Sequence, residues 1–353
     1  MNWLIWRQYR KQLLIFIGIL GIFAAVAVPF GLHFWNHYQD ILRVCTPTNS
    51  CKENEIRDVV FSTTVEGLAP NFVKLSLLVL PLFLGLFWGV PLIAKEYAEN
   101  TNKLAWTQGI SRRRWLTVKL AWALLAAAVY AGIFAALATW FSRTGNAINH
   151  DRFNELAFSS QGIVPVAATV FAVAAGAMFG AWFKKLLPAL GVTLGLLLVV
   201  QIAVPLLVRP HYQDVQTYTV SLNKEFESRG RHEFAPQGPA EQDWAIDTKQ
   251  VDRLGKALDP IHPPQQCIIN EDKVDNEVHT QSEENKPRSA AFSLAGGPII
   301  QVDCLVTLGY NWEVKYQPGY RYWNFQRIEA ALYLAMTGLA VGATYWLVSK
   351  RDA

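Results

Sequence analysis

Cysteines and histidines are the residues of this chain whose types could support metal or redox chemistry. No two cysteines have the spacing of a zinc ribbon, so we expect no metal site. The alternative is a metal site built from the two later cysteines and two nearby histidines, although these four residues include no close-spaced ligand pair of the zinc type. The cysteines are Cys45, Cys51, Cys267 and Cys304, and the histidines concerned are His262 and His279.

The sequence lacks the short motifs that carry catalytic groups. It contains no G-x-x-x-x-G-K-[ST] loop for nucleotide phosphates, no H-E-x-x-H and no G-x-S-x-G. We therefore expect that this chain is not an enzyme, holds no cofactor and does not hydrolyse ATP by itself. The alternative is a membrane enzyme with an unrecognised site in its polar segment.

The composition indicates a membrane protein. Of 353 residues, 52% are hydrophobic and 17% charged, with 13 Trp, 19 Phe and 12 Tyr, a balance too apolar for an ordinary soluble domain. The net charge of +4 is typical of membrane proteins, because Lys and Arg collect in their cytoplasmic loops. We expect no nucleic acid among the partners.

Apolar runs long enough to cross a bilayer occur six times. A crossing helix needs about 20 residues to traverse about 30 Å of hydrocarbon. The sequence therefore predicts six transmembrane helices. They cover residues 13–35, 72–94, 116–141, 162–183, 186–208 and 329–348.

Basic residues near the span ends predict the orientation, because such residues stay on the cytoplasmic side. All four basic groups fall on one side of a six-span protein, so both termini are predicted to be cytoplasmic in a multi-pass protein of a bacterial plasma membrane. A secretory signal ending near Ala25-Val26-Ala27 is the alternative, but the first apolar run is too long for one. The groups are Arg7, Arg10 and Lys11; the 95–119 loop; Lys184 and Lys185; and Lys350 and Arg351.

The polar segment between spans five and six predicts a separate domain. Residues 241–258 have helical spacing, and residues 297–318 are β-branched and partly alternating, which favours strands. The predicted fold is an all-α polytopic membrane protein with a small α+β extracellular domain inserted between helices five and six. Its first part, residues 1–208, holds the first five helices, an N-terminal interfacial helix before span one and a cytoplasmic helix at 95–108. The other parts are 209–326 with the extracellular domain, and 327–353 with the sixth helix and a short cytoplasmic tail.

All four cysteines fall on the predicted outer face, where an oxidising environment permits disulfides. Cys45 and Cys51 follow span one, and Cys267 and Cys304 lie in the polar segment. Three pairings are possible. Proximity in sequence favours Cys45 with Cys51 and Cys267 with Cys304, and free thiols are the alternative.

The spans carry no Asp, Glu, Lys, Arg or His in their central portions, which disfavours an ion-driven pump. Glycines at four-residue spacing predict close helix packing, and prolines predict kinks or broken helices. The glycine pairs are Gly85 and Gly89, Gly176 and Gly180, Gly191 and Gly195, and Gly338 and Gly342; the prolines are Pro81, Pro91, Pro188 and Pro205.

Residues 95–119 separate spans two and three and are too charged to cross the bilayer, at a cost of roughly 20 kcal/mol. Their spacing predicts a short cytoplasmic helix over 95–108, ended by Gly109, with Ser111 as the N-cap of the next helix. An ordinary loop whose arginines meet lipid headgroups is the alternative.

The stretch FWGVPLIAKEYAENTNKLAWTQGISRRRWLTVKL at 87–120 resembles the integral-membrane permease of a bacterial ABC exporter whose ATPase is a separate polypeptide. The opening MNWLIWRQYRKQ and residues 316–333 look like the actinobacterial branch of such permeases. One departure is Asn100, where many relatives have glycine. The matching positions are Glu96, Thr101, Leu104 with Thr107, Ser111 with Arg112, and Trp115 with Lys119.

The resemblance implies that the 95–108 helix is a coupling helix that docks on an ABC ATPase. It also implies two ATPase copies that bind ATP and Mg, a second permease copy in a homodimer, and export of an amphipathic or hydrophobic molecule. A membrane sensor, mechanotransmitter or immunity protein is the alternative function. The docking residues would be Glu96, Tyr97, Thr101, Leu104 and Thr107, and those that set topology and contact headgroups would be Arg7, Arg10, Lys11, Arg112, Arg113 and Arg114.

Overall fold

The chain forms two compact units in the computed structural model. The first unit comprises Met1–Tyr212 and Arg321–Ala353, and the second comprises Gln213–Tyr320. The two units are described separately below. The structure describes residues 2–44, 64–99, 111–149, 152–221, 238–240, 242–259, 264–269, 291–293 and 299–350.

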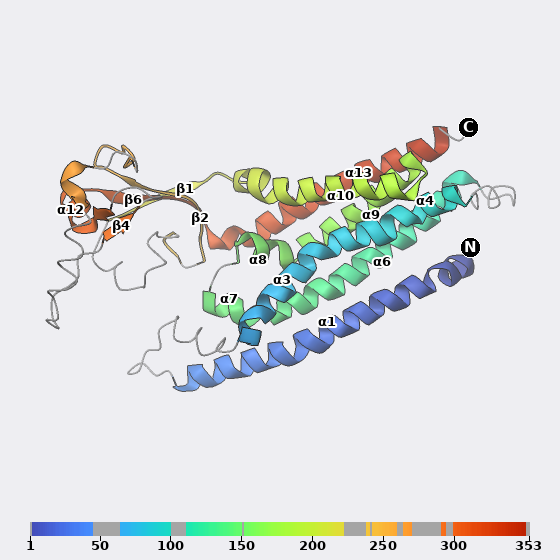
Figure 1. Cartoon of the computed structure of the whole chain (residues 1–353), viewed down its shortest axis with the longest axis horizontal. Helices are drawn as coiled ribbons and strands as arrows, with labels where there is room; N and C mark the ends of the chain where they lie inside the picture. The colour runs from blue at the N-terminus through green and yellow to red at the C-terminus, as the bar shows by residue number, and fades with distance from the viewer. Residues whose placement is uncertain are drawn as a thin grey trace. The chain divides into compact units, whose positions relative to one another are not determined.

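The first unit is a bundle of helices, and in its described residues six are long and apolar enough to cross a membrane (Figure 1). This confirms the predicted number of spans. Two short helices, α7 (Arg143–Asn149) and α8 (Glu155–Ser160), connect the third span to the fourth. The spans are α1 (Asn2–Val44); α3 (Thr64–Leu84) with η1 (Gly85–Gly89) and α4 (Val90–Ala98); α6 (Arg112–Phe141); α9 (Val164–Phe183); α10 (Leu186–Ala203) with η2 (Val204–Val208) and η3 (Arg209–His211); and α13 (Tyr322–Lys350).

Two spans contain a π-helical turn next to a proline. In η1 the Val90 N–H bonds the Gly85 carbonyl, and in η2 the Arg209 N–H bonds the Val204 carbonyl. Pro91 and Pro205 have no N–H, so each interrupts the α-helical ladder, and the wider turn satisfies neighbouring backbone groups. At two of the four predicted prolines, Pro91 and Pro205, the break takes the form of a single π turn, whereas α3 and α10 remain α-helical at Pro81 and Pro188.

Helix α9 lies at the centre of the bundle, in contact with α3, α4, α6, α10 and α13. Two of the predicted glycine pairs make its close contact with η1 and α4. A Cβ atom added at Gly89 would lie 2.6 Å from the Val173 carbonyl oxygen, and one added at Gly180 would lie 2.7 Å from that of Val90. The pairs on α10 and α13 behave differently, since a Cβ at Gly191 or Gly338 would meet nothing within 4 Å.

In its described residues, the second unit contains two small antiparallel sheets. The first has the order β1-β6-β2, and the second has the order β3-β5-β4. A short helix, α12 (Val302–Thr307), separates β5 from β6. The strands are β1 (Gln216–Ser221), β2 (Trp244–Val251), β3 (Ile268–Ile269), β4 (Ala291–Ser293), β5 (Ile299–Gln301) and β6 (Asn311–Gln317).

The helix predicted over 241–258 is wrong, because Trp244–Val251 is strand β2. Ile246, Thr248 and Val251 are β-branched, and the strand pairs with β6 from Trp244 to Val251. Pairing with a distant partner outweighs the local helical spacing. The strands predicted over 297–318 are present as β5 and β6, with α12 between them.

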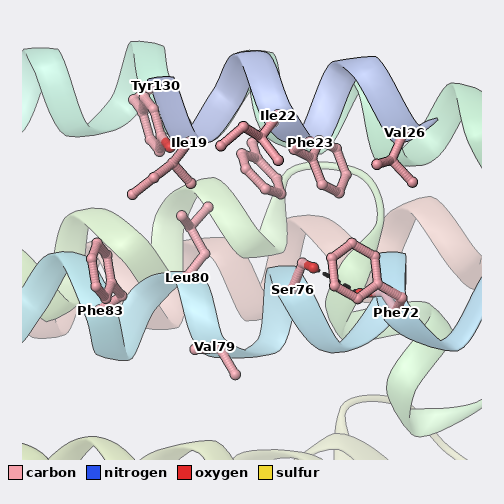
Figure 2. A pocket seen from close by; sticks show the side chains of 11 residues that line it. Ile19, Ile22, Phe23, Val26, Phe72, Ser76, Val79, Leu80, Phe83 and Tyr130 are labelled. Carbon is pink, nitrogen blue, oxygen red and sulfur yellow. Dashed lines mark hydrogen bonds between the residues drawn. The ribbon is translucent and has the colours of Figure 1, made fainter. Parts of the chain in front are cut away.

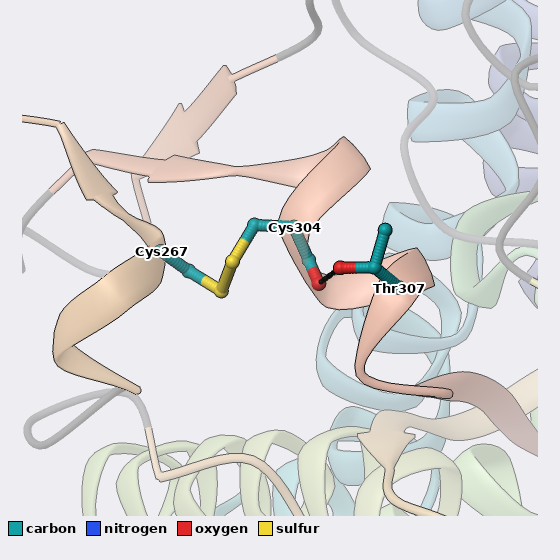
Figure 3. Close-up of a disulfide and its surroundings, with 3 residues drawn as sticks. All are labelled: Cys267, Cys304 and Thr307. Carbon is teal, nitrogen blue, oxygen red and sulfur yellow. Dashed lines mark hydrogen bonds between the residues drawn. A yellow bond between two sulfur atoms is a disulfide. The ribbon is translucent and has the colours of Figure 1, made fainter.

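A disulfide joins Cys267 to Cys304, with Cα atoms 5.4 Å apart (Figure 3). It links η5 (Gln265–Cys267) to α12, and Cys267 packs in a small buried cluster with Leu258 and Leu305. The covalent link thus reinforces the small core of the second unit. Cys45 and Cys51 lie outside the described residues.

Candidate functional site

The end of α4 and the beginning of α6 flank residues 100–110, and a buried ion pair connects them. The Glu96 carboxylate on α4 accepts a hydrogen bond from the Lys119 ammonium on α6. Only 10% of the Glu96 side chain and 4% of the Lys119 side chain are exposed. The Lys119 ammonium also lies 4.9 Å from the ring centre of Trp115.

Neighbouring residues of α4 differ sharply in exposure. Lys95 and Glu99 form an ion pair of 3.8 Å on the outer face, with 65% and 54% of their side chains exposed. Tyr97 is half-buried, and its ring lies 5.0 Å from the ammonium of Lys184 at the end of α9. One face of α4 is therefore fixed to the bundle, and the other is open to a partner.

Helix α6 begins as predicted, with the Ser111 hydroxyl accepting a hydrogen bond of 3.4 Å from the Arg114 N–H. This cap satisfies one of the N–H groups that the first helical turn leaves unbonded. Arg113 and Arg114 are exposed and Arg112 is half-buried. The start of α1, the end of α4 and the end of α13 lie at this same end of the bundle (Figure 1).

Several predicted site residues lie beyond what the structure describes. Thr101, Leu104 and Thr107 fall in residues 100–110, which are outside the described part of the chain. The backbone of Arg7, Arg10 and Lys11 belongs to α1, but their side chains are not among those described. The roles predicted for these residues stay predictions.

A second buried ion pair lies near the opposite end of the bundle, between Arg209 of η3 and Glu329 of α13. The guanidinium donates two hydrogen bonds of 2.9 Å to the carboxylate and a third of 2.9 Å to the Ser159 hydroxyl. It also lies 4.1 Å from the ring centre of Phe158, and both charged side chains are at most 1% exposed. Burial and the nearby Glu329 carboxylate raise the pKa of Tyr212, so its hydroxyl stays protonated and donates to Glu329.

Gln326 connects the same region to the start of α9. Its side-chain oxygen accepts from the Ile163 and Val164 N–H groups, each at 3.1 Å, and its amide donates to the Phe158 and Gln161 carbonyls. These bonds satisfy N–H groups at a helix start and fix α8 to α13. Both ion pairs sit near span ends, as expected from the absence of charges at the span centres.

Sequence reasoning did not find either ion pair. The partners of the first are 23 residues apart and those of the second are 120 residues apart. One signal could have indicated them. In each pair, one charge lies at the end of a span and the opposite charge lies at the beginning of the next span in sequence. Charges at such positions are costly unless they are paired.

These features define a polytopic α-helical membrane protein with charged groups paired at the span ends. Among the described residues, no group of three or more His, Cys, Asp or Glu side chains could hold a metal ion. The family model described as "ABC-2 membrane transporter related" matches residues 17–209, more than half of the chain. The chain belongs to this family. It matches no curated protein and no solved structure.

Membership in this family identifies the chain as a permease component of an ABC transporter. Such a component is the transmembrane part and not the ATPase, in keeping with a sequence that has no phosphate-binding loop. Membership also implies an ABC ATPase as a partner. Any ATP-driven movement of the spans would therefore start in that ATPase.

Proposed function

We propose that this chain exports an amphipathic or hydrophobic molecule, and that its ATPase acts on the bundle through the segment between α4 and α6. In this proposal two copies of the chain pair as a homodimer, and two ATPase subunits bind ATP and Mg. The chain ends are cytoplasmic, Arg7, Arg10, Lys11 and Arg112 to Arg114 contact lipid headgroups, and the second unit is extracellular.

The observation that supports the proposal best is the buried Glu96–Lys119 pair. It joins the two helices on either side of residues 100–110, so a force on that segment acts on α4 and α6 together. Helix α4 then packs on α9 through Val90 and Gly180, whose contact leaves no room for a side chain. Because packed helices move as rigid elements, a displacement at this end would reach the centre of the bundle.

The burial of Glu96 changes how we assign the docking residues. Its carboxylate holds α4 to α6, and we propose that it positions the coupling segment. Direct contact with the ATPase is then proposed for Tyr97, Thr101, Leu104 and Thr107, with the exposed Lys95 and Glu99 beside them. ATP shifts the permease only if it binds one ATPase arrangement better than the other.

Co-purification tests the proposal. The tagged chain is co-expressed with each ABC ATPase of its genome that has no transmembrane part of its own, and the Tyr97→Ala, Leu104→Ala double variant is compared with wild type. We expect wild type to retain one ATPase and the variant to lose it. A matched control is the double variant of Tyr320 and Leu254 to Ala, exposed residues of the second unit. Equal ATPase recovery from all three proteins would contradict the proposed docking.

A further inference from the structure

An apolar pocket lies between α1, α3 and α6 and opens on a side of the bundle with exposed apolar side chains (Figure 2). Its volume is about 290 Å³, close to the lower end for pockets that hold small organic ligands, about 300 Å³. Ile22 and Phe72, at its edge, are 70% and 53% exposed. The interior is lined by apolar side chains such as Phe23, Leu80 and Phe134.

One polar group in the wall of this pocket forms no hydrogen bond with another described residue. The Tyr130 side chain lines the pocket and only 8% of the residue is exposed, yet its hydroxyl has no hydrogen-bond partner in the described part of the chain. The other hydroxyl, that of Ser76, already donates to the Phe72 carbonyl at 2.7 Å. The pocket wall therefore holds one O–H donor without a partner among the described residues, and its oxygen is buried behind neighbouring side chains.

The depth of Tyr130 decides what could accept that hydrogen bond. Helix α6 has 30 residues, and Tyr130 lies about 27 Å along its axis from Arg112 and about 16 Å from Phe141, at about 1.5 Å per residue. With α6 centred in the bilayer, the Cα of Tyr130 is about 10 Å inside the nearer edge of the hydrocarbon. Water is scarce at that depth, and the ester oxygens of phospholipids lie outside it.

We propose that this pocket binds a neutral, mainly hydrocarbon molecule that carries an acceptor oxygen within its apolar body, such as a ketone, quinone or lactone. A small shift of the side chains around Tyr130 lets its hydroxyl donate to that oxygen, and the aromatic and aliphatic wall covers the rest. The open edge between α1 and α3 admits the molecule from the lipid. The inference concerns binding by this chain alone, so it does not rest on the proposed ATPase coupling.

A photolabelling experiment on the purified full chain in lipid nanodiscs, without ATPase, tests the inference. Benzophenone is the probe, because it is a neutral ketone that inserts into neighbouring C–H bonds on illumination. We expect labelled peptides from α1 and α3, identified by mass spectrometry. Labelling spread evenly over the lipid-facing helices would overturn the proposal.

Two competitors of equal shape measure the hydrogen bond. Fluorenone carries a carbonyl and fluorene does not, so fluorenone should protect wild type about three- to tenfold better, the range expected for one hydrogen bond. In Tyr130→Phe this preference should vanish. Both proteins sit in the same lipid, so partitioning of the competitors cancels in the comparison. Equal preference in both proteins would mean that the hydroxyl bonds water or nothing.

A second pair of variants tests the pocket itself. Val79→Trp enlarges a side chain of the pocket wall, whereas Val129→Trp changes a similarly exposed valine of α6 that does not line the pocket. We expect the first variant to lose most benzophenone labelling and the second to keep it. Unchanged labelling in Val79→Trp would refute the proposed site even if Tyr130→Phe failed to fold.

Discussion

Substitution of the buried Glu96–Lys119 pair tests how much this ion pair contributes to the stability of the first unit. Glu96→Gln leaves the Lys119 ammonium without its carboxylate at a position where 4% of the side chain is exposed. Removing one partner of a buried ion pair costs about 3 to 5 kcal/mol in soluble proteins. We expect a loss of that order in the stability of the first unit, and a clear fall in its apparent Tm.

Glu99→Gln is the matched control, on the same helix and with the same chemical change. Its partner Lys95 is 3.8 Å away and both side chains are more than half exposed, so water already solvates the charges. Such pairs contribute about 0 to 1 kcal/mol. Thermal unfolding followed by fluorescence size-exclusion chromatography compares the two variants. A loss in Glu96→Gln no greater than that in Glu99→Gln would refute the reasoning.

A double variant separates a positioning role for Glu96 from direct docking. Glu96→Gln with Lys119→Met removes both charges, and replacing a buried pair by uncharged side chains is often close to neutral for stability. If Glu96 only positions the segment, the double variant should recover both stability and ATPase binding. If the carboxylate itself contacts the ATPase, stability returns but binding does not.

Three further predictions concern other parts of the chain. Gly89→Ala should cost about 1 to 3 kcal/mol, because its Cβ would meet the Val173 carbonyl at 2.6 Å, whereas Gly191→Ala should cost little; urea titration in detergent compares them. Arg209→Met should lower the Tm of the first unit strongly, because Glu329 loses its partner, and the Arg209→Met, Glu329→Met double variant should regain much of the loss. Replacing Cys267 and Cys304 together by Ser should destabilise the second unit by about 3 to 4 kcal/mol, as judged by limited proteolysis, because the bond closes a loop of 37 residues.

The six spans could be predicted because the bilayer fixes both their length and their composition. Local chemistry also sufficed for the start of α6, where Ser111 is followed by a helix-forming run. Strand β2 could not be predicted, since its conformation depends on pairing with β6, whose first residue is 60 positions beyond the last residue of β2. The ion pairs depend on the relative rotation of whole helices about their axes, and the local spacing of apolar residues in one span does not contain that information.

The π turn η1 lies inside the second span, seven residues before the buried Glu96, whereas η2 ends directly before Arg209. The position of η1 has a mechanical consequence. The Glu96–Lys119 and Arg209–Glu329 pairs fix helix ends to one another, while η1 interrupts the α-helical ladder inside the second span. A π turn can lose or shift its extra residue with little change at the helix ends, because only a few hydrogen bonds exchange partners. Turn η1 packs directly on α9 through Gly85 and Gly89, so such a shift would move backbone against backbone at the centre of the bundle.

A force applied to the segment after Glu96 would therefore first change the backbone between Leu84 and Val90. Cysteine crosslinking between η1 and α9, with and without ATP and the ATPase partner, would detect this movement, and identical crosslinking in both states would contradict it.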